Sequence, residues 1–173
     1  MHLLRDALPH ARGRSRLIVI GLGNAFRGDD AAGLAVARGL GDDPRVVVHE
    51  GEPIGLLDAW EGADEVIVVD AARSGAAPGT VHRLDGLAGP SGLRGSTHAF
   101  GLADTLELAR TLGRAPARVT IYGIEGERFT AGEELSPAVA RAVEEVRSEL
   151  CERLGKSAAG GRQAPDGETP AQT

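Results

Sequence analysis

The chain has 173 residues, of which 42% are apolar and 25% are charged, as is usual for one globular domain with its own core. Its formal net charge of −6 argues against nucleic acids and anionic membranes as partners, since both are usually bound by a basic surface. The single cysteine, Cys151, excludes an intramolecular disulfide framework and a zinc site built from cysteines.

The two ends of the chain differ from its middle. Residues 1–15 lack the apolar stretch of a signal peptide and are predicted to form a disordered leader. Residues 155–173 are rich in Gly, Ala, Pro and polar side chains, which predicts a disordered tail. Residues 16–154 are therefore expected to form a single domain. Because no apolar run is long enough to span a membrane, the expected location is the cytoplasm.

Between these ends, apolar runs alternate with helical patterns. The run Leu17–Gly21 is typical of a strand covered on both faces, and a Gly-rich turn follows it. Residues 85–95 contain too much Gly and Pro for regular structure and are predicted to form a mobile loop. In chain order, the predicted elements are a strand at 17–21, a helix at 29–40, a strand at 46–50, a short helix at 54–60, a buried strand at 65–69, an edge strand at 79–84, a helix from 97 to 112, a strand at 119–124 and a helix from 137 to 154.

This order of elements predicts an α/β fold. Strands that alternate with helices form a three-layer αβα arrangement around a mostly parallel open sheet, here of about five strands. In such folds the ligand site lies at the carboxyl ends of the strands, near the point where the strand order reverses. Residues that follow the strands are therefore the candidates for a functional site.

Three such residues, Asp30, Asp70 and His98, could meet at that edge and bind a divalent metal. Asp30 follows the first strand, and Asp70 closes the third, where a buried charge is usually paired or metal-bound. His98 begins a helix, where the helix dipole favours the neutral imidazole that binds metals.

Each residue also has a purely structural explanation. Asp29 or Asp30 could cap a helix, with the other carboxylate pointing into the cleft. Asp70 could cap the next segment or pair with Arg73, and a histidine at a helix start often only packs. Cys151, at the margin of the last helix's apolar stripe, is predicted to pack in the core. The other four histidines, His2, His10, His49 and His82, show no comparable placement.

A nucleotide-binding protein is a second interpretation. The turn with Gly21, Gly23 and Gly28 follows a strand and precedes a helix, as a dinucleotide-binding loop does, and Glu50 could bind a ribose. The glycine spacing differs from that fingerprint by one or two residues. Asp29 and Asp30 would also repel a pyrophosphate at this helix start unless a metal intervened.

A series of short motifs resembles the hydrogenase maturation proteases, which are endopeptidases that trim the C-terminus of nickel-iron hydrogenase large subunits. The motifs run in order along nearly all of the predicted domain and are specific only together. They are Ile20–Asn24, Arg27–Asp30 with Gly33, Val69–Ala71, Pro78–Gly79, Ser96–His98 with Gly101–Leu102, Gly123–Glu125 and Leu135–Pro137.

The resemblance implies that Asp30, Asp70 and His98 are the family's metal-binding trio and form the catalytic site. It also implies that nickel arrives already installed in the substrate, so no tightly bound cofactor is expected. The partner is then the precursor of a nickel-iron hydrogenase large subunit. The protease recognises the nickel bound in this precursor and only then cuts it. The metal could polarise the scissile carbonyl or activate water.

Two departures from the family pattern are visible. The first ligand is Glu in some members and is Asp30 in this chain. Glu50-Gly51-Glu52-Pro53 stands where many members have an Asp-Gly-Gly-Thr-like segment. Glu50 is therefore a candidate accessory acid or catalytic base, and Glu50, Glu52 and the 85–95 loop are expected to grip the substrate. A third hypothesis is an escort protein that checks the metal in the precursor but does not cleave it. Separately, the size of the domain favours a monomer.

Overall fold

The computed structural model describes residues 16–50, 53–85 and 99–155. The predicted leader, nearly all of the predicted tail, most of the predicted 85–95 loop, and the residues Glu52 and His98 lie outside the described residues. Among the residues described, no helix is long and apolar enough to cross a membrane.

Five strands form one sheet in the order β2-β1-β3-β5-β4. Neighbouring strands run parallel except β4, which pairs antiparallel with β5 at one edge. The strand order and direction confirm the predicted α/β fold with a mostly parallel open sheet and an edge strand. The strands are β1 (Leu17–Gly23), β2 (Val46–Glu50), β3 (Glu65–Ala72), β4 (Val81–Asp85) and β5 (Arg118–Glu125).

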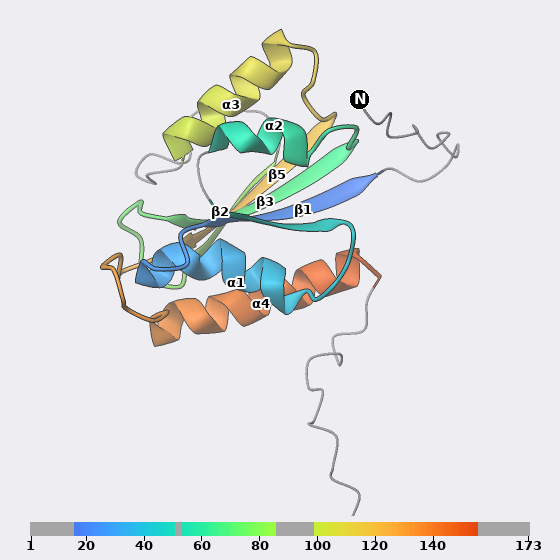
Figure 1. The fold of residues 1–173 in the computed structure, drawn as a ribbon. Coiled ribbons are helices and arrows are strands. Elements are labelled where there is room, and N and C mark those ends of the chain that lie inside the picture. Colours follow the sequence, from blue (N-terminus) through green and yellow to red (C-terminus); the bar gives the residue numbers. More distant parts are fainter. Residues whose placement is uncertain (1–15, 51–52, 86–98, 156–173) are drawn as a thin grey trace, which may run out of the picture.

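Helices cover both faces of this sheet, which gives the three predicted layers (Figure 1). One face is covered by α1 (Ala32–Gly39) and α4 (Pro137–Arg153), and the other by α2 (Leu56–Ala59) and α3 (Ala99–Thr111). Because β5 follows α3 after a short connection at the amino edge of the sheet, α3 begins nearer the carboxyl edge, as a helix between two parallel strands does.

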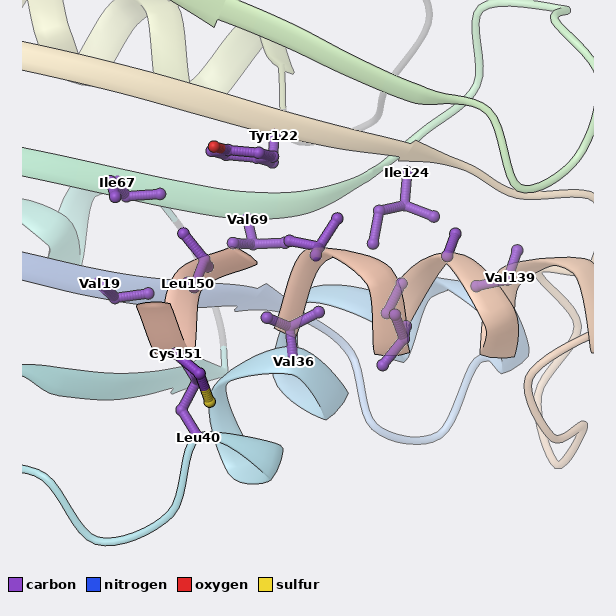
Figure 2. Close-up of a cluster of buried hydrophobic side chains, with 14 of the residues drawn as sticks. Val19, Val36, Leu40, Ile67, Val69, Tyr122, Ile124, Val139, Leu150 and Cys151 are labelled. Atoms are coloured by element: carbon purple, nitrogen blue, oxygen red, sulfur yellow. The ribbon is translucent and has the colours of Figure 1, made fainter. Parts of the chain in front are cut away.

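Side chains that alternate along the strands form a separate core on each face. Figure 2 shows the core under α1 and α4, where Val19, Val69 and Ile124 of the sheet meet Val36 and Leu150 of the helices. Cys151 belongs to this core and is 4% exposed, so the predicted packing role is confirmed. The core under α2 and α3 contains, among others, Ile20, Leu22, Val66, Val68, Leu102, Leu106 and Ile121.

This alternation fixes the direction of the polar residues at the carboxyl ends of the strands. Val66 and Val68 of β3 lie in the core under α2 and α3, so Asp70, two residues further, is on that face. The same argument, starting from Val119 and Ile121 of β5, places Gly123 and Glu125 there. The strand β3 extends to Ala72, so Asp70 lies two residues before its end and does not close it as predicted.

Glycines let α1 lie directly on the backbone of the sheet. A Cβ atom at Gly21 would come within 2.1 Å of the Gly33 carbonyl oxygen. At Gly33 it would come within 2.1 Å of the Val69 oxygen and 2.4 Å of the Leu22 oxygen. These close approaches are enough to explain why glycine is needed at these positions, so a nucleotide-binding role is not required to explain it. They also bring the start of α1 down onto the ends of β1 and β3.

We expect Gly33→Ala to destabilise the fold by at least about 2 kcal/mol, because the added methyl group meets two backbone oxygens that cannot turn away. The control is Gly39→Ala in the same helix, where the nearest atom is the flexible Arg147 Cδ and alanine favours the helix. Urea unfolding of both variants measures the difference. Equal stability of the two variants would contradict the packing argument.

Candidate functional site

The carboxyl ends of β1, β2, β3 and β5 lie at one edge of the sheet and carry the predicted site residues. Asp30 follows β1 in a short 3₁₀ helix, Gly28–Ala31, which replaces the first turn of the predicted 29–40 helix. Asp70 lies in β3 and Glu50 is the last residue of β2. The third predicted metal ligand, His98, directly precedes α3 in the sequence and lies outside the described residues.

Asp29 holds this edge together. Its carboxylate is fully buried, and its Oδ2 accepts hydrogen bonds at 2.9 Å from the backbone N–H groups of Glu127 and Arg128. Its Oδ1 accepts a third, at 2.6 Å, from the N–H of Ser136. Asp29 therefore ties the turn after β1 to the loop after β5 and to the start of α4. It is the structural member of the Asp29–Asp30 pair.

The start of α4 differs in detail from the sequence prediction. Ser136 occupies the N-cap position and Pro137 the first helical position, as expected. The Ser136 hydroxyl, however, makes no capping hydrogen bond. What fixes this helix start is the backbone N–H of Ser136 on Asp29, a contact between residues 107 positions apart. A long-range acceptor has therefore replaced the local cap.

Asp30 is buried beside the end of β1. It is 2% exposed, and its backbone oxygen accepts a hydrogen bond from the N–H of Asn24 at 3.2 Å. The Arg27 guanidinium lies 3.9 Å from its Oδ2. In a 3₁₀ helix with three residues per turn, consecutive side chains point about 120° apart, so Asp29 and Asp30 face different surroundings.

Asp70 is 4% exposed on the α2 and α3 face, and its Oδ1 accepts a hydrogen bond from the Ala71 N–H at 2.8 Å. The predicted alternative of an ion pair with Arg73 is not formed. Arg73 instead lies over the ring of Phe129, 4.4 Å from its centre. A buried carboxylate at this position thus has a role other than pairing with the neighbouring arginine.

Glu50 is in a different setting from the two aspartates. Its side chain is 46% exposed and forms an ion pair with Arg38 of α1. In the sheet, β1 separates β2 from β3, and Glu50 is in register with Gly23 of β1. The structure therefore places Glu50 at the predicted edge, although its carboxylate is engaged by a helix on the face opposite to Asp70.

Glu125 and its partners form a cluster that the sequence prediction missed. Glu125 is 2% exposed at the end of β5; its Oε2 accepts a hydrogen bond from the Ser74 hydroxyl at 2.8 Å, and its Oε1 from the Gly75 N–H at 2.7 Å. His82 Nε2 lies 3.3 Å from the same Oε2. Burial alone would raise the pKa of the Glu125 carboxyl, but the hydrogen bonds from Ser74, Gly75 and His82 outweigh it and hold the pKa below its usual value.

Sequence alone could not have selected His82. The alternation in residues 79–84 indicated a strand, but it did not indicate the strand's partner or register. In the structure His82 pairs with Gly123, and Gly123 pairs with Asp70, so the three residues form one row across the sheet. Among the described residues, no three His, Cys, Asp or Glu side chains could together hold a metal ion. The predicted metal trio therefore depends on His98.

Comparison with known proteins gives the family. The sequence model described as hydrogenase maturation protease, HycI, matches residues 44–153, which is well over half of the chain. The chain belongs to the hydrogenase maturation protease family. The resemblance carried by the short motifs is thus confirmed, and the protein is a peptidase.

Relatives and solved structures agree with this assignment. The chain is 29% identical over 151 residues to the Hydrogenase 2 maturation protease of Escherichia coli, covering 82% of this chain and 92% of the relative. It is 29% identical over 149 residues to the hydrogenase expression/formation protein HupD of Rhodobacter capsulatus, covering 80% and 71%.

The fold is also shared with solved maturation proteases. The endopeptidase HybD of Escherichia coli superposes with a TM-score of 0.70 at 28% identity, over 81% of this chain and 92% of that one. The [NiFe] hydrogenase maturation protease HycI of Thermococcus kodakarensis gives a TM-score of 0.66 at 25% identity, over 84% and 96%. The fold and the family thus rest on independent comparisons.

Proposed function

We propose that this protease removes a C-terminal peptide from the precursor of a nickel-iron hydrogenase large subunit, and that it acts only on the nickel-loaded precursor. In this proposal Asp30, Asp70 and His98 engage the nickel carried by the substrate. The observation that supports it is the pair of buried carboxylates, Asp30 and Asp70, at one edge of the sheet in a member of this protease family. The helix that directly follows His98 begins at the same edge.

The substrate's nickel would supply the Lewis acidity for hydrolysis, by polarising the scissile carbonyl or by activating water. The protein's part is to hold two carboxylate oxygens and one imidazole at the metal, ligands that suit several divalent ions. Because Asp30 and Asp70 are 2% and 4% exposed, little water surrounds them, and their attraction for a cation is stronger than it would be at the surface.

The setting proposed for this reaction is the cytoplasm, with the protease acting as a monomer and without a resident cofactor. Neither nucleic acid nor membrane takes part in the proposal, in line with the net charge of −6. Substrate would be held at the carboxyl edge by Glu50, Glu52 and the 85–95 loop.

The intact mass of a cognate precursor, nickel-loaded and nickel-free, tests the proposal after incubation with this protein. Loss of a C-terminal peptide from the loaded form alone supports it. Binding without any loss of mass would favour the non-cleaving escort. Cleavage of both forms at one rate would overturn the nickel check but leave the protease activity.

Glu50→Gln tests the prediction that Glu50 is the catalytic base. If it is, we expect cleavage of the loaded precursor to slow by about 100-fold, the usual contribution of a positioned base. Arg38→Gln is the matched variant, because it removes the partner of Glu50 and leaves the carboxylate in place. A Glu50→Gln protein that cuts at the parental rate would eliminate Glu50 as base and leave it a role in gripping substrate.

A further inference from the structure

The row formed by Asp70, Gly123 and His82 is the starting point for a further inference, which rests on the proposed function. Asp70 of β3 is in register with Gly123 of β5, which is in register with His82 of β4. Paired residues point to the same face of a sheet, so Asp70 and His82 both face the α2 and α3 layer. Their Cα atoms are two strand spacings apart, about 10 Å. Because Gly123 has no side chain, the space between them on this face is not filled from β5.

Glu125 fixes the imidazole of His82 at this position. Glu125 lies two residues beyond Gly123 on β5, which makes it a diagonal neighbour of His82 and within reach of a long side chain. The distance from Nε2 of the ring to Oε2 of Glu125 is 3.3 Å. The side chain of His82 is 29% exposed, whereas that of Glu125 is 2% exposed. A buried carboxylate thus holds a histidine that reaches the surface, as in known triads.

The hydrogen-bond directions separate the roles of the three side chains. The Ser74 hydroxyl donates to Glu125 Oε2, so its proton is not directed at His82 and Ser74 acts as a support rather than as a nucleophile. When Nε2 carries the proton shared with Glu125, Nδ1 holds the free lone pair of the ring. Among the described residues Nδ1 makes no hydrogen bond. It is therefore the nitrogen available to exchange a proton.

We propose that His82 is the proton-transfer group of the peptide hydrolysis and that Glu125 is its positioning residue. Water forms the new C–O bond at the scissile carbonyl and gives one proton to Nδ1 of His82. The imidazolium then gives this proton to the leaving amine nitrogen as the C–N bond breaks. The ring ends in its starting state, and the water has been divided between the two products. His82 thus serves first as base and then as acid.

The structure favours His82 over Glu50 for this task. His82 shares a face and a register row with Asp70, whereas Glu50 lies on β2 and its carboxylate is paired with Arg38. On the described strands β3 and β5, the charged side chains that share the face of His82 are Asp70 and Glu125. On its own strand, Arg83 faces the opposite side, over the ring of Tyr122. Neither β5 nor β3 places a cation on the face of His82 that would oppose its protonation.

The experiment measures kcat and KM for cleavage of the nickel-loaded precursor by His82→Gln, His82→Ala and Glu125→Gln. We expect His82→Gln to lower kcat by about 100-fold or more with little change in KM, and Glu125→Gln to lower kcat by about 10-fold. Added imidazole should restore part of the activity of His82→Ala, since it replaces the missing base. The matched control is Arg83→Gln, next on β4 and facing the other side, which should cut at the parental rate.

A purely structural cluster would behave differently. If Ser74, His82 and Glu125 only tie the β3–β4 connection to β5, the His82 variants lose melting temperature but keep kcat. Imidazole then changes nothing, and the proposal is overturned. Should His82→Ala fail to fold, kcat of the His82→Gln variant, whose side chain is polar and of similar length, still decides. Absence of cleavage by the parental protein overturns the proposed function and this proposal together, whereas parental cleavage with an equally active His82→Gln overturns this proposal alone.

Discussion

Asp70→Asn is expected to lower cleavage of the nickel-loaded precursor by more than about 100-fold. Removal of an outer partner of a metal ligand costs 10- to 100-fold, and loss of a ligand's charge should cost more. The variant keeps the size of the side chain and an oxygen that can accept the Ala71 N–H bond of 2.8 Å. Folding should therefore be preserved, and the loss is attributed to the missing charge. Mass spectrometry of the precursor over time measures the rate.

Binding gives a second measurement that separates metal recognition from chemistry. The parental protein should bind loaded precursor more tightly than nickel-free precursor, and Asp70→Asn should bind both alike. The control is Asp58→Asn on α2, whose carboxylate is 87% exposed and pairs with Arg114 at the opposite edge. Undiminished cleavage by Asp70→Asn, with Asp58→Asn also unchanged, would remove Asp70 from the proposed metal site.

The three central strands β1, β3 and β5 could be predicted from the sequence because their side chains are covered on both faces. Short, continuous apolar runs such as Leu17–Gly21 and Glu65–Val69 are typical of strands in a sheet that helices cover on both faces. The glycines after β1 were harder to interpret. A turn that accommodates a phosphate and a turn that lets a helix touch a strand both need residues without Cβ atoms. The short contact from Gly21 to the Gly33 oxygen shows that the second need applies.

The candidate site was predicted less completely, and the reason is sequence distance. Which of Asp29 and Asp30 is structural depends on the N–H groups of residues about 100 positions away, which no local pattern reports. The alignment of His82 with Asp70 depends on the register of two strand pairs. Glu125 lies just beyond the strand predicted at 119–124, and its partners come from a separate segment, 74–82. To predict which side chains on different strands lie together, one must know the register of the strand pairs, and sequence patterns seldom fix that register.

Asp29→Ala is expected to destabilise the protein by about 3 kcal/mol or more. The buried carboxylate satisfies three backbone N–H groups, and each donor left unpaired costs about 1–3 kcal/mol. A loss of this size should lower the melting temperature by roughly 10 °C in a domain of this length. The stability of Asp29→Asn should lie between that of Asp29→Ala and that of the parent. Its amide keeps one acceptor oxygen, which can accept from two of the three donors at most.

Calorimetry of the two Asp29 variants and the parent measures this order of stabilities. The control for the loss of an aspartate as such is Asp42→Ala, at an exposed position after α1. The expected order follows from the number of acceptor oxygens left at position 29. Asp29→Ala as stable as the parent would show that the loop after β5 finds other acceptors. In that case the start of α4 and the placement of Asp30 would not depend on Asp29. The assignment of a structural role to Asp29 and of metal binding to Asp30 would then be wrong.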